Sequence, residues 1–133
     1  MYKKVLIVDD ESEYRLIVKD FLQDNFMVSV YEAVDGADAM FKLRNDEFSV
    51  VITDLAMPKL SGIDLLRFIQ ANIKKPSQTH VIILSGSIDA AVVENINQKS
   101  GRVKAFLKPF DTNELFKELS PHLTAKRQDQ NSA

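Results

Sequence analysis

Cysteine is absent from the 133 residues, and glycine and proline are scarce, with four of each. Without cysteine the chain cannot form a disulfide scaffold, a thiolate zinc site or a cysteine nucleophile. It also lacks an apolar run near the roughly 20 residues of a membrane span, a signal-peptide core and a Gly-rich phosphate loop. These absences predict a cytoplasmic domain that is not inserted into a membrane and is not a P-loop nucleotidase.

The charges are nearly balanced, with 17 Lys and Arg against 19 Asp and Glu and a formal net charge of −2. Such a balance argues against a surface built chiefly to hold nucleic acid, so no direct nucleic-acid partner is expected. With 45% apolar and 27% charged residues, the composition is that of an ordinary globular protein of one domain.

Five short apolar runs predict β-strands. Four are too short and too uniformly apolar to be amphipathic helices, and Val and Ile dominate the first three, as expected for strands covered on both faces of a parallel sheet. They span residues 5–8, 50–52, 81–84 and 105–107. The fifth run, at 27–31, carries Ser29 between two valines and indicates a less buried strand at an edge of the sheet.

Helical periodicity occupies the segments between and after these runs. The first helix is predicted from apolar residues at i, i+3 and i+4 spacing, which form one buried stripe. These residues are Tyr14, Ile17, Val18, Phe21 and Leu22. Four more helices are expected around residues 37–43, 62–69, 88–96 and 115–123, and Phe41 is expected in the core or at its margin.

Regular alternation of strand and helix predicts an α/β fold. The expected architecture is a doubly wound, five-stranded parallel sheet, (βα)5, with helices on both faces. It covers residues 1–123. Residues 124–133 are polar and are expected to form a tail or the start of a linker.

Polar residues follow four of the five predicted strands at their carboxyl ends, where open parallel sheets bind ligands. These residues are Asp9 and Asp10, Thr53 and Asp54, Ser85 and Gly86, and Lys108 and Pro109. The strand at 27–31 ends in Glu32 and Ala33, as an edge strand away from a site would.

Three of these residues are aspartates, and carboxylates at one rim repel each other. The repulsion is roughly 4 kcal/mol for a pair about 4 Å apart at an effective dielectric near 20. Lys108 offsets only part of it, so the rim calls for a divalent cation with oxygen ligands, and Mg²⁺ fits. With both cations in place the rim would attract a phosphoryl group, which a carboxylate can itself accept.

Four stretches of the chain, VLIVDD, VVITDLAMP, VIILSG and AFLKPF, follow one another in this order. Together they resemble the receiver domain of bacterial two-component response regulators of the chemotaxis-regulator type, over residues 3–122. The resemblance implies the flavodoxin-like strand order 2-1-3-4-5. It also implies a phosphorelay switch rather than an enzyme, phosphorylated by a histidine kinase or a histidine phosphotransfer protein.

By the same resemblance, Asp54 is the phosphoacceptor. Asp10, Asp54 and the backbone carbonyl of Ala56 are implied to bind Mg²⁺ directly, and Asp9 to act through a metal-bound water. Ala56 and Ser87 flank the site and carry no carboxylate or amide that would orient an attacking water. We therefore expect slow self-dephosphorylation.

The remaining site residues are implied to respond to phosphorylation. Lys108 would pair with phosphoryl oxygens and precede a cis bond to Pro109, while Ser85 would shift toward the phosphoryl group. One position departs from the family, because Ala105 stands where an aromatic ring often follows the hydroxyl. Phe106 should face the other side of its strand, so the signal is expected to pass through the loop after Ser85 and the fourth helix.

The surface implied to respond covers the fourth helix, the last strand and the fifth helix, at residues 87–122. It is expected to contact a downstream protein or a second copy of the chain. If the receiver is part of a longer protein, an output domain of the same chain is the expected partner.

Other functions are less well matched. A haloacid-dehalogenase-like phosphohydrolase has a second acid two residues after its nucleophile, where this chain has Ala56. A flavodoxin-like cofactor binder would have its phosphate repelled by the three acids, and a receiver-like interaction module that is not phosphorylated remains an alternative. His80 and His122 are far apart in sequence without partners at metal-ligand spacing, so no metal site is predicted there.

Overall fold

Five parallel strands form one sheet in the computed structural model, which describes residues 2–55, 62–72, 79–86, 91, 94–95 and 102–127. The strands are β1 (Lys3–Val8), β2 (Val28–Ala33), β3 (Val50–Thr53), β4 (His80–Ser85) and β5 (Val103–Leu107). They lie in the order β2-β1-β3-β4-β5, and every neighbouring pair is parallel. The predicted fold class and strand order are confirmed.

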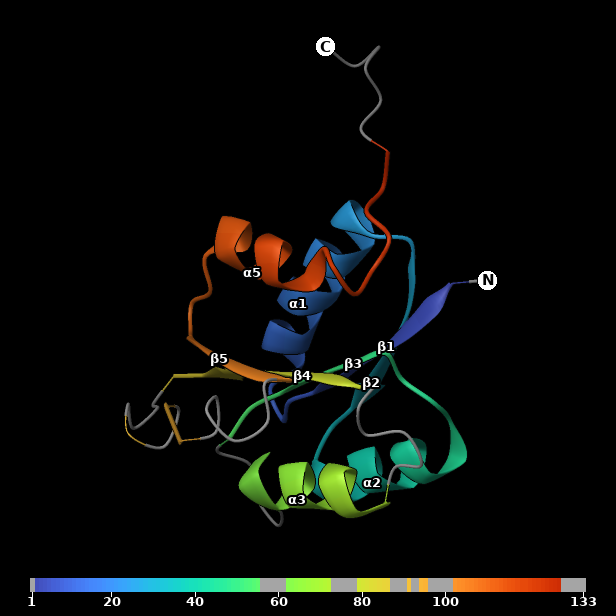
Figure 1. The fold of residues 1–133 in the computed structure, drawn as a ribbon, viewed down its shortest axis with the longest axis vertical. Coiled ribbons are helices and arrows are strands. Elements are labelled where there is room, and N and C mark those ends of the chain that lie inside the picture. The colour runs from blue at the N-terminus through green and yellow to red at the C-terminus, as the bar shows by residue number, and fades with distance from the viewer. Residues whose placement is uncertain are drawn as a thin grey trace.

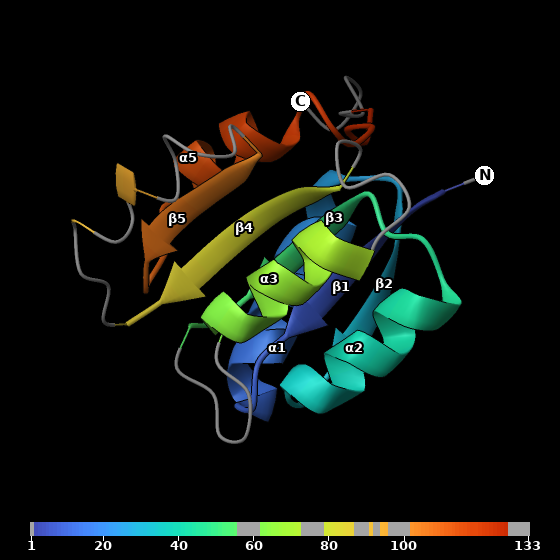
Figure 2. The same ribbon diagram turned by 60° about the horizontal axis from the view of Figure 1, so that its bottom comes forward.

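Helices cover both faces of the sheet. They are α1 (Ser12–Asn25), α2 (Gly36–Asn45), α3 (Gly62–Asn72) and α5 (Thr112–Leu119). Helices α1 and α5 lie together on one face, and α2 and α3 on the other (Figures 1 and 2). None of the helices that the structure describes is long and apolar enough to cross a membrane.

The expected fourth helix is described at three positions only. Ala91, Glu94 and Asn95 have helical backbone, and the other residues of 88–96 lie outside the described part of the chain.

Helix α5 begins at an N-cap residue, Asp111. The side chain of Asp111 accepts hydrogen bonds from the backbone N–H groups of Asn113 and Glu114, which satisfies two donors of the first turn.

The core consists of two apolar layers, one on each face of the sheet. Successive residues of β1 alternate between them, with Leu6 in the layer under α2 and α3 and Ile7 in the layer under α1 and α5. Every residue of β3 and β4 is buried, which explains why these runs are uniformly apolar. The pattern of β2 is mixed, as predicted for an edge strand.

Two apolar side chains that the periodicity placed in or near the core are exposed instead. Ile17 is 53% exposed and Phe41 is 65% exposed. In α1 the buried stripe runs through Val18 and Leu22, and Ile17 is turned by about 100° from Val18. Phe41 lies two residues from the buried Leu43, which puts it on nearly the opposite side of α2.

The chain after α5 stays in contact with the domain for several residues. Leu123 is buried. Residues of the predicted polar tail then pair with the turn between α1 and β2, where the Met27 N–H donates to the Thr124 carbonyl and the Lys126 N–H donates to the Asn25 carbonyl, both at 2.8 Å. This turn and the end of α5 are thereby held together.

Candidate functional site

The carboxyl ends of the central strands bring the predicted site residues to one rim. Backbone pairing continues one residue past the strands, with the Asp9 N–H donating to the Ala33 carbonyl and the Asp54 N–H to the Val8 carbonyl, both at 3.2 Å. At the other side of the rim the Lys108 N–H donates to the Ser85 carbonyl at 2.8 Å. These backbone hydrogen bonds therefore fix the positions of Asp9, Asp54, Ser85 and Lys108 relative to one another along the edge of the sheet.

Lys108 is the centre of this rim. Its Nζ donates one hydrogen bond to Asp9 Oδ2 and one to Asp54 Oδ2, both at 2.8 Å. The partners are 99 and 54 residues away in sequence. All three side chains are largely removed from water, with 13%, 5% and 8% exposed for Lys108, Asp9 and Asp54. A charged lysine between two carboxylates is the arrangement expected where buried charges must be paired.

The surroundings of Lys108 keep it charged. Burial lowers the pKa of the Lys108 amine, but its hydrogen bonds to Asp54 and Asp9 outweigh burial, and the pKa is raised above its ordinary value of 10.5. The ring of Tyr14, from α1, lies 3.9 Å from the Nζ atom, at cation–π distance. Burial in turn raises the pKa of the Tyr14 hydroxyl, so this ring is neutral at pH 7.

A cluster of carboxylates beside Lys108 fits a divalent cation. Asp9, Asp10 and Glu11 each place a carboxylate oxygen within 4.8 Å of the others. Asp9 is buried while Asp10 and Glu11 are exposed, and the Glu11 N–H donates to Asp9 Oδ1 at 2.9 Å. Oxygen donors that are partly open to water suit Mg²⁺, which retains several waters. Glu11 belongs to this carboxylate cluster but was not among the site residues predicted from the sequence. Its position directly after Asp9 and Asp10 was the signal that could have identified it.

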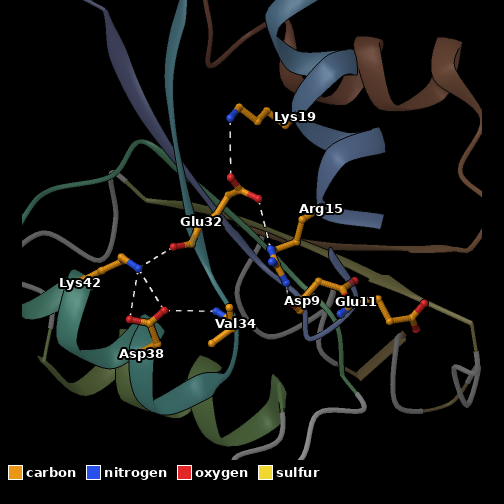
Figure 3. Close-up of polar contacts among 8 residues, drawn as sticks. All are labelled: Asp9, Glu11, Arg15, Lys19, Glu32, Val34, Asp38 and Lys42. Atoms are coloured by element: carbon orange, nitrogen blue, oxygen red, sulfur yellow. Dashed lines mark hydrogen bonds and ion pairs between the residues drawn. The ribbon is translucent and has the colours of Figure 1, made fainter. Parts of the chain in front are cut away.

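A network of ion pairs and hydrogen bonds holds the backbone at Asp9, between β1 and α1 (Figure 3). Arg15 of α1 donates to the Asp9 carbonyl at 2.8 Å through Nη1 and to Glu32 Oε1 at 3.2 Å through Nε. Glu32 also faces Lys19 at 3.7 Å, and its backbone carbonyl accepts from Lys42 at 2.6 Å. Glu32 therefore joins β2 to the Asp9 backbone through Arg15, a contact that the sequence did not indicate.

The other predicted site residues are placed as follows. Ser85 is buried at the end of β4, and the Lys108–Pro109 peptide bond is cis. Ala105 packs against the core layer under α2 and α3, while Phe106 packs against the opposite layer, so the two residues face opposite sides as predicted. Ala56 and Ser87 lie outside the described residues.

The sequence did not reveal a second cluster, far from the rim. His80 and His122 stack with ring centroids 4.0 Å apart, and His80 Nε2 lies 2.9 Å from Glu118 Oε2. The sequence spacing predicted no metal site at these histidines, but in the structure their donor atoms and that of Glu118 all lie within 4.8 Å of one another. Their separation of 42 positions in the chain gives no local spacing signal.

The fold and the rim define a class of protein: a flavodoxin-like α/β domain whose carboxyl edge carries a lysine bound between two aspartates. The family model described as "Response regulator receiver domain" matches residues 5–120. The chain belongs to this family of receiver domains, which serve two-component signalling.

Relatives and solved structures agree with this assignment. The chain is 37% identical to the chemotaxis protein CheY-3 of Vibrio cholerae over 108 residues, which cover 80% of this chain and 81% of the relative. Its fold is similar to that of V. cholerae CheY4, with a TM-score of 0.78, 28% identity and coverage of 92% and 100%. It is also similar in fold to the receiver domain of the sensor histidine kinase PA1611 from Pseudomonas aeruginosa, with a TM-score of 0.76 and 22% identity. That match covers 92% of this chain and 98% of the other. The PA1611 domain was solved with a magnesium ion in its active-site cleft.

Proposed function

We propose that this domain is a phosphorylation-dependent switch of a cytoplasmic phosphorelay and that Asp54 accepts the phosphoryl group. The observation that carries the proposal is the buried contact of Lys108 Nζ with both Asp9 and Asp54 at 2.8 Å. It places a fixed positive charge directly beside a carboxylate nucleophile. Phosphoryl transfer needs chiefly positioning and charge stabilisation, and the rim supplies both.

The donor is a phosphohistidine of a histidine kinase or of a histidine phosphotransfer protein. A carboxylate oxygen of Asp54 forms the new O–P bond while the P–N bond to the donor imidazole breaks, and the imidazole nitrogen keeps the electron pair and takes up a proton. Lys108 then exchanges its contact with Asp54 for one with a phosphoryl oxygen. Ser85, at the end of β4, donates a hydrogen bond to another phosphoryl oxygen.

The donor set of the rim fits Mg²⁺. Asp10, Asp54 and the Ala56 carbonyl would hold the ion, with Asp9 acting through a water and the exposed Glu11 close by. The bound ion would supply charge that neutralises the phosphoryl oxygens. Magnesium in the cleft of the P. aeruginosa receiver supports this assignment.

The conformational response to phosphorylation does not use an aromatic ring at position 105, which is alanine. Ala105 has no ring to turn, and Phe106 is packed on the other face of the sheet. We therefore assign the response to the loop after Ser85 and the fourth helix, and the partner surface to residues 87–122. A downstream protein, an output domain of a longer chain or a second copy would bind there.

Phosphoryl uptake is the direct test. Incubation of the purified domain with Mg²⁺ and a small acyl phosphate is expected to add the mass of one phosphoryl group, because Asp54 is a competent nucleophile once Lys108 and the cation neutralise the incoming oxygens. Intact-protein mass spectrometry measures the gain. Removal of the divalent cation with EDTA serves as the control and should prevent it. An unmodified mass in the presence of Mg²⁺ would favour the interaction module that is not phosphorylated.

The phosphorylated domain should lose its phosphoryl group slowly. Ala56 has no polar side-chain group and Ser87 has only a hydroxyl, so neither supplies the carboxylate or amide that would orient an attacking water well. We expect self-dephosphorylation to be slower than in a matched double variant, Ala56→Asn with Ser87→Glu, which supplies an amide and a carboxylate. Loss of radioactive label over time gives both rates, and a wild-type lifetime of seconds would contradict the prediction.

A further inference from the structure

A cluster of two histidines and one glutamate lies at the opposite end of the sheet from the aspartate rim. His80 is the first residue of β4, whose last residue, Ser85, is at the rim. Glu118 lies in the last turn of α5, and His122 follows that helix. The donor atoms of the three side chains all lie within 4.8 Å of one another. The proposed phosphoryl chemistry uses none of them.

One distance within the cluster is close to that between two ligands of one metal ion, and the other donor atoms lie within 4.8 Å. Zn²⁺ binds imidazole nitrogen at about 2.0–2.1 Å and carboxylate oxygen at about 2.0–2.2 Å, so two ligands of a tetrahedral ion are about 3.3 Å apart. His80 Nε2 and Glu118 Oε2 are 2.9 Å apart. The rings of His80 and His122 are stacked at 19°, so their in-plane lone pairs run nearly parallel, and at least one ring must rotate out of the stack for both to point at the same ion.

Several contacts hold these ligands in place. The His80 side chain is only 6% exposed, and its backbone N–H donates to the Ser49 carbonyl at 2.9 Å. The carbonyl of His122 accepts a hydrogen bond from Lys3 Nζ at 2.9 Å. Burial, together with the nearby His122, lowers the pKa of His80 even though Glu118 opposes this.

We propose that His80, Glu118 and His122 form a binding site for a transition-metal dication such as Zn²⁺. Two imidazoles and one carboxylate fill three positions of a tetrahedral ion and leave the fourth for water. Nitrogen donors separate this site from the all-oxygen rim that suits Mg²⁺. The ion would join the start of β4 to the end of α5 and so restrain one end of the surface at residues 87–122. The positive charge of nearby Arg102, which also lowers the pKa of His80, would moderate the affinity.

Calorimetric titration with Zn²⁺, in a large excess of Mg²⁺ to occupy the rim, tests the proposal. Wild-type protein should bind one Zn²⁺ per chain, and its thermal unfolding midpoint should rise with Zn²⁺ concentration. His122→Ala removes a partly exposed ligand. Loss of a residue that only hydrogen-bonds to a ligand weakens metal binding roughly 10- to 100-fold. Loss of the ligand itself should therefore weaken Zn²⁺ binding by more than this. Glu118→Gln should weaken it in the same direction.

Two further variants locate the bound ion. Glu114→Gln, one turn earlier on α5 and exposed, should bind Zn²⁺ as the wild type does. Asp10→Asn, which alters the rim, should also retain Zn²⁺ binding. Absence of stoichiometric binding in the wild type, unchanged affinity in His122→Ala, or loss of affinity in Asp10→Asn would overturn the site. None of these Zn²⁺-binding results bears on whether wild-type Asp54 accepts a phosphoryl group, so the two proposals fail independently.

Discussion

Asp54→Asn is expected to abolish phosphoryl uptake from a small acyl phosphate. The substitution keeps the shape of the side chain but replaces the carboxylate by an amide, which is not a nucleophile at neutral pH. Lys108 retains its contact with Asp9 in this variant, so the rim loses one buried negative charge without leaving a lysine unpaired. The domain should therefore fold with a stability close to or above that of the wild type while its mass stays unchanged in the phosphorylation assay.

A matched control separates loss of the acceptor from loss of charge in general. Asp20→Asn removes a carboxylate from the exposed side of α1 and should be phosphorylated as fully as the wild type. If the Asp54→Asn variant still gained one phosphoryl group, the acceptor would have to be another rim carboxylate such as Asp9 or Asp10. Peptide mapping after reductive trapping of the acyl phosphate would identify it.

Lys108→Met is expected to lower the free energy of unfolding by about 2–4 kcal/mol in buffer containing EDTA. The substitution leaves Asp9 and Asp54 buried and close together with no cation between them, and breaking a fully buried pair in this way costs about 3–5 kcal/mol. The expected value is somewhat smaller because Lys108 retains 13% exposure. It is still a large share of the roughly 5–15 kcal/mol that stabilises a domain. Urea denaturation gives the value, and phosphoryl uptake should fall as well.

Two changes should restore part of the free energy of unfolding that Lys108→Met loses. Mg²⁺ brings positive charge to the same carboxylates, so adding it should restore part of the stability of Lys108→Met. Combining Lys108→Met with Asp54→Asn removes one of the two repelling charges and should be less destabilising than the single substitution, a coupling that a double-mutant cycle measures. Lys104→Met, an exposed position on the same strand, is the control. A drop below about 1 kcal/mol would show that the contacts at Lys108 are worth no more than a surface ion pair.

The direction of the pKa shift sets the pH range of this effect. The pKa of Lys108 is raised in the folded domain, so between neutral pH and about 10.5 its charge stabilises the fold fully, and the contribution is lost as the pH rises through the folded-state value. The difference between wild type and Lys108→Met should therefore be fully present at pH 7. Above pH 7 it should shrink only in strongly alkaline buffer.

Much of the fold could be read from local pattern. Strands β1, β3 and β4 are runs of Val, Ile and Leu because both faces of a central parallel strand are covered, and such runs are visible without knowing their neighbours. Helix α1 was located correctly, yet Ile17 was placed on the wrong side of it. Periodicity identifies an apolar stripe, but how wide a stripe the sheet covers depends on the packing of α1 against its neighbours.

The amino-acid sequence by itself determined the strand–helix alternation and that Asp9, Asp54 and Lys108 follow strands at the rim, because parallel strands deliver their carboxyl ends to one edge. It could not determine that Arg15 ties Glu32 to the Asp9 backbone, or that His80 meets Glu118 and His122. Those contacts join side chains whose distance depends on how the helices dock on the sheet. Only the tertiary structure decided them, since neither hydrogen bonds nor metal-ligand distances between remote residues leave a periodic signal in the chain.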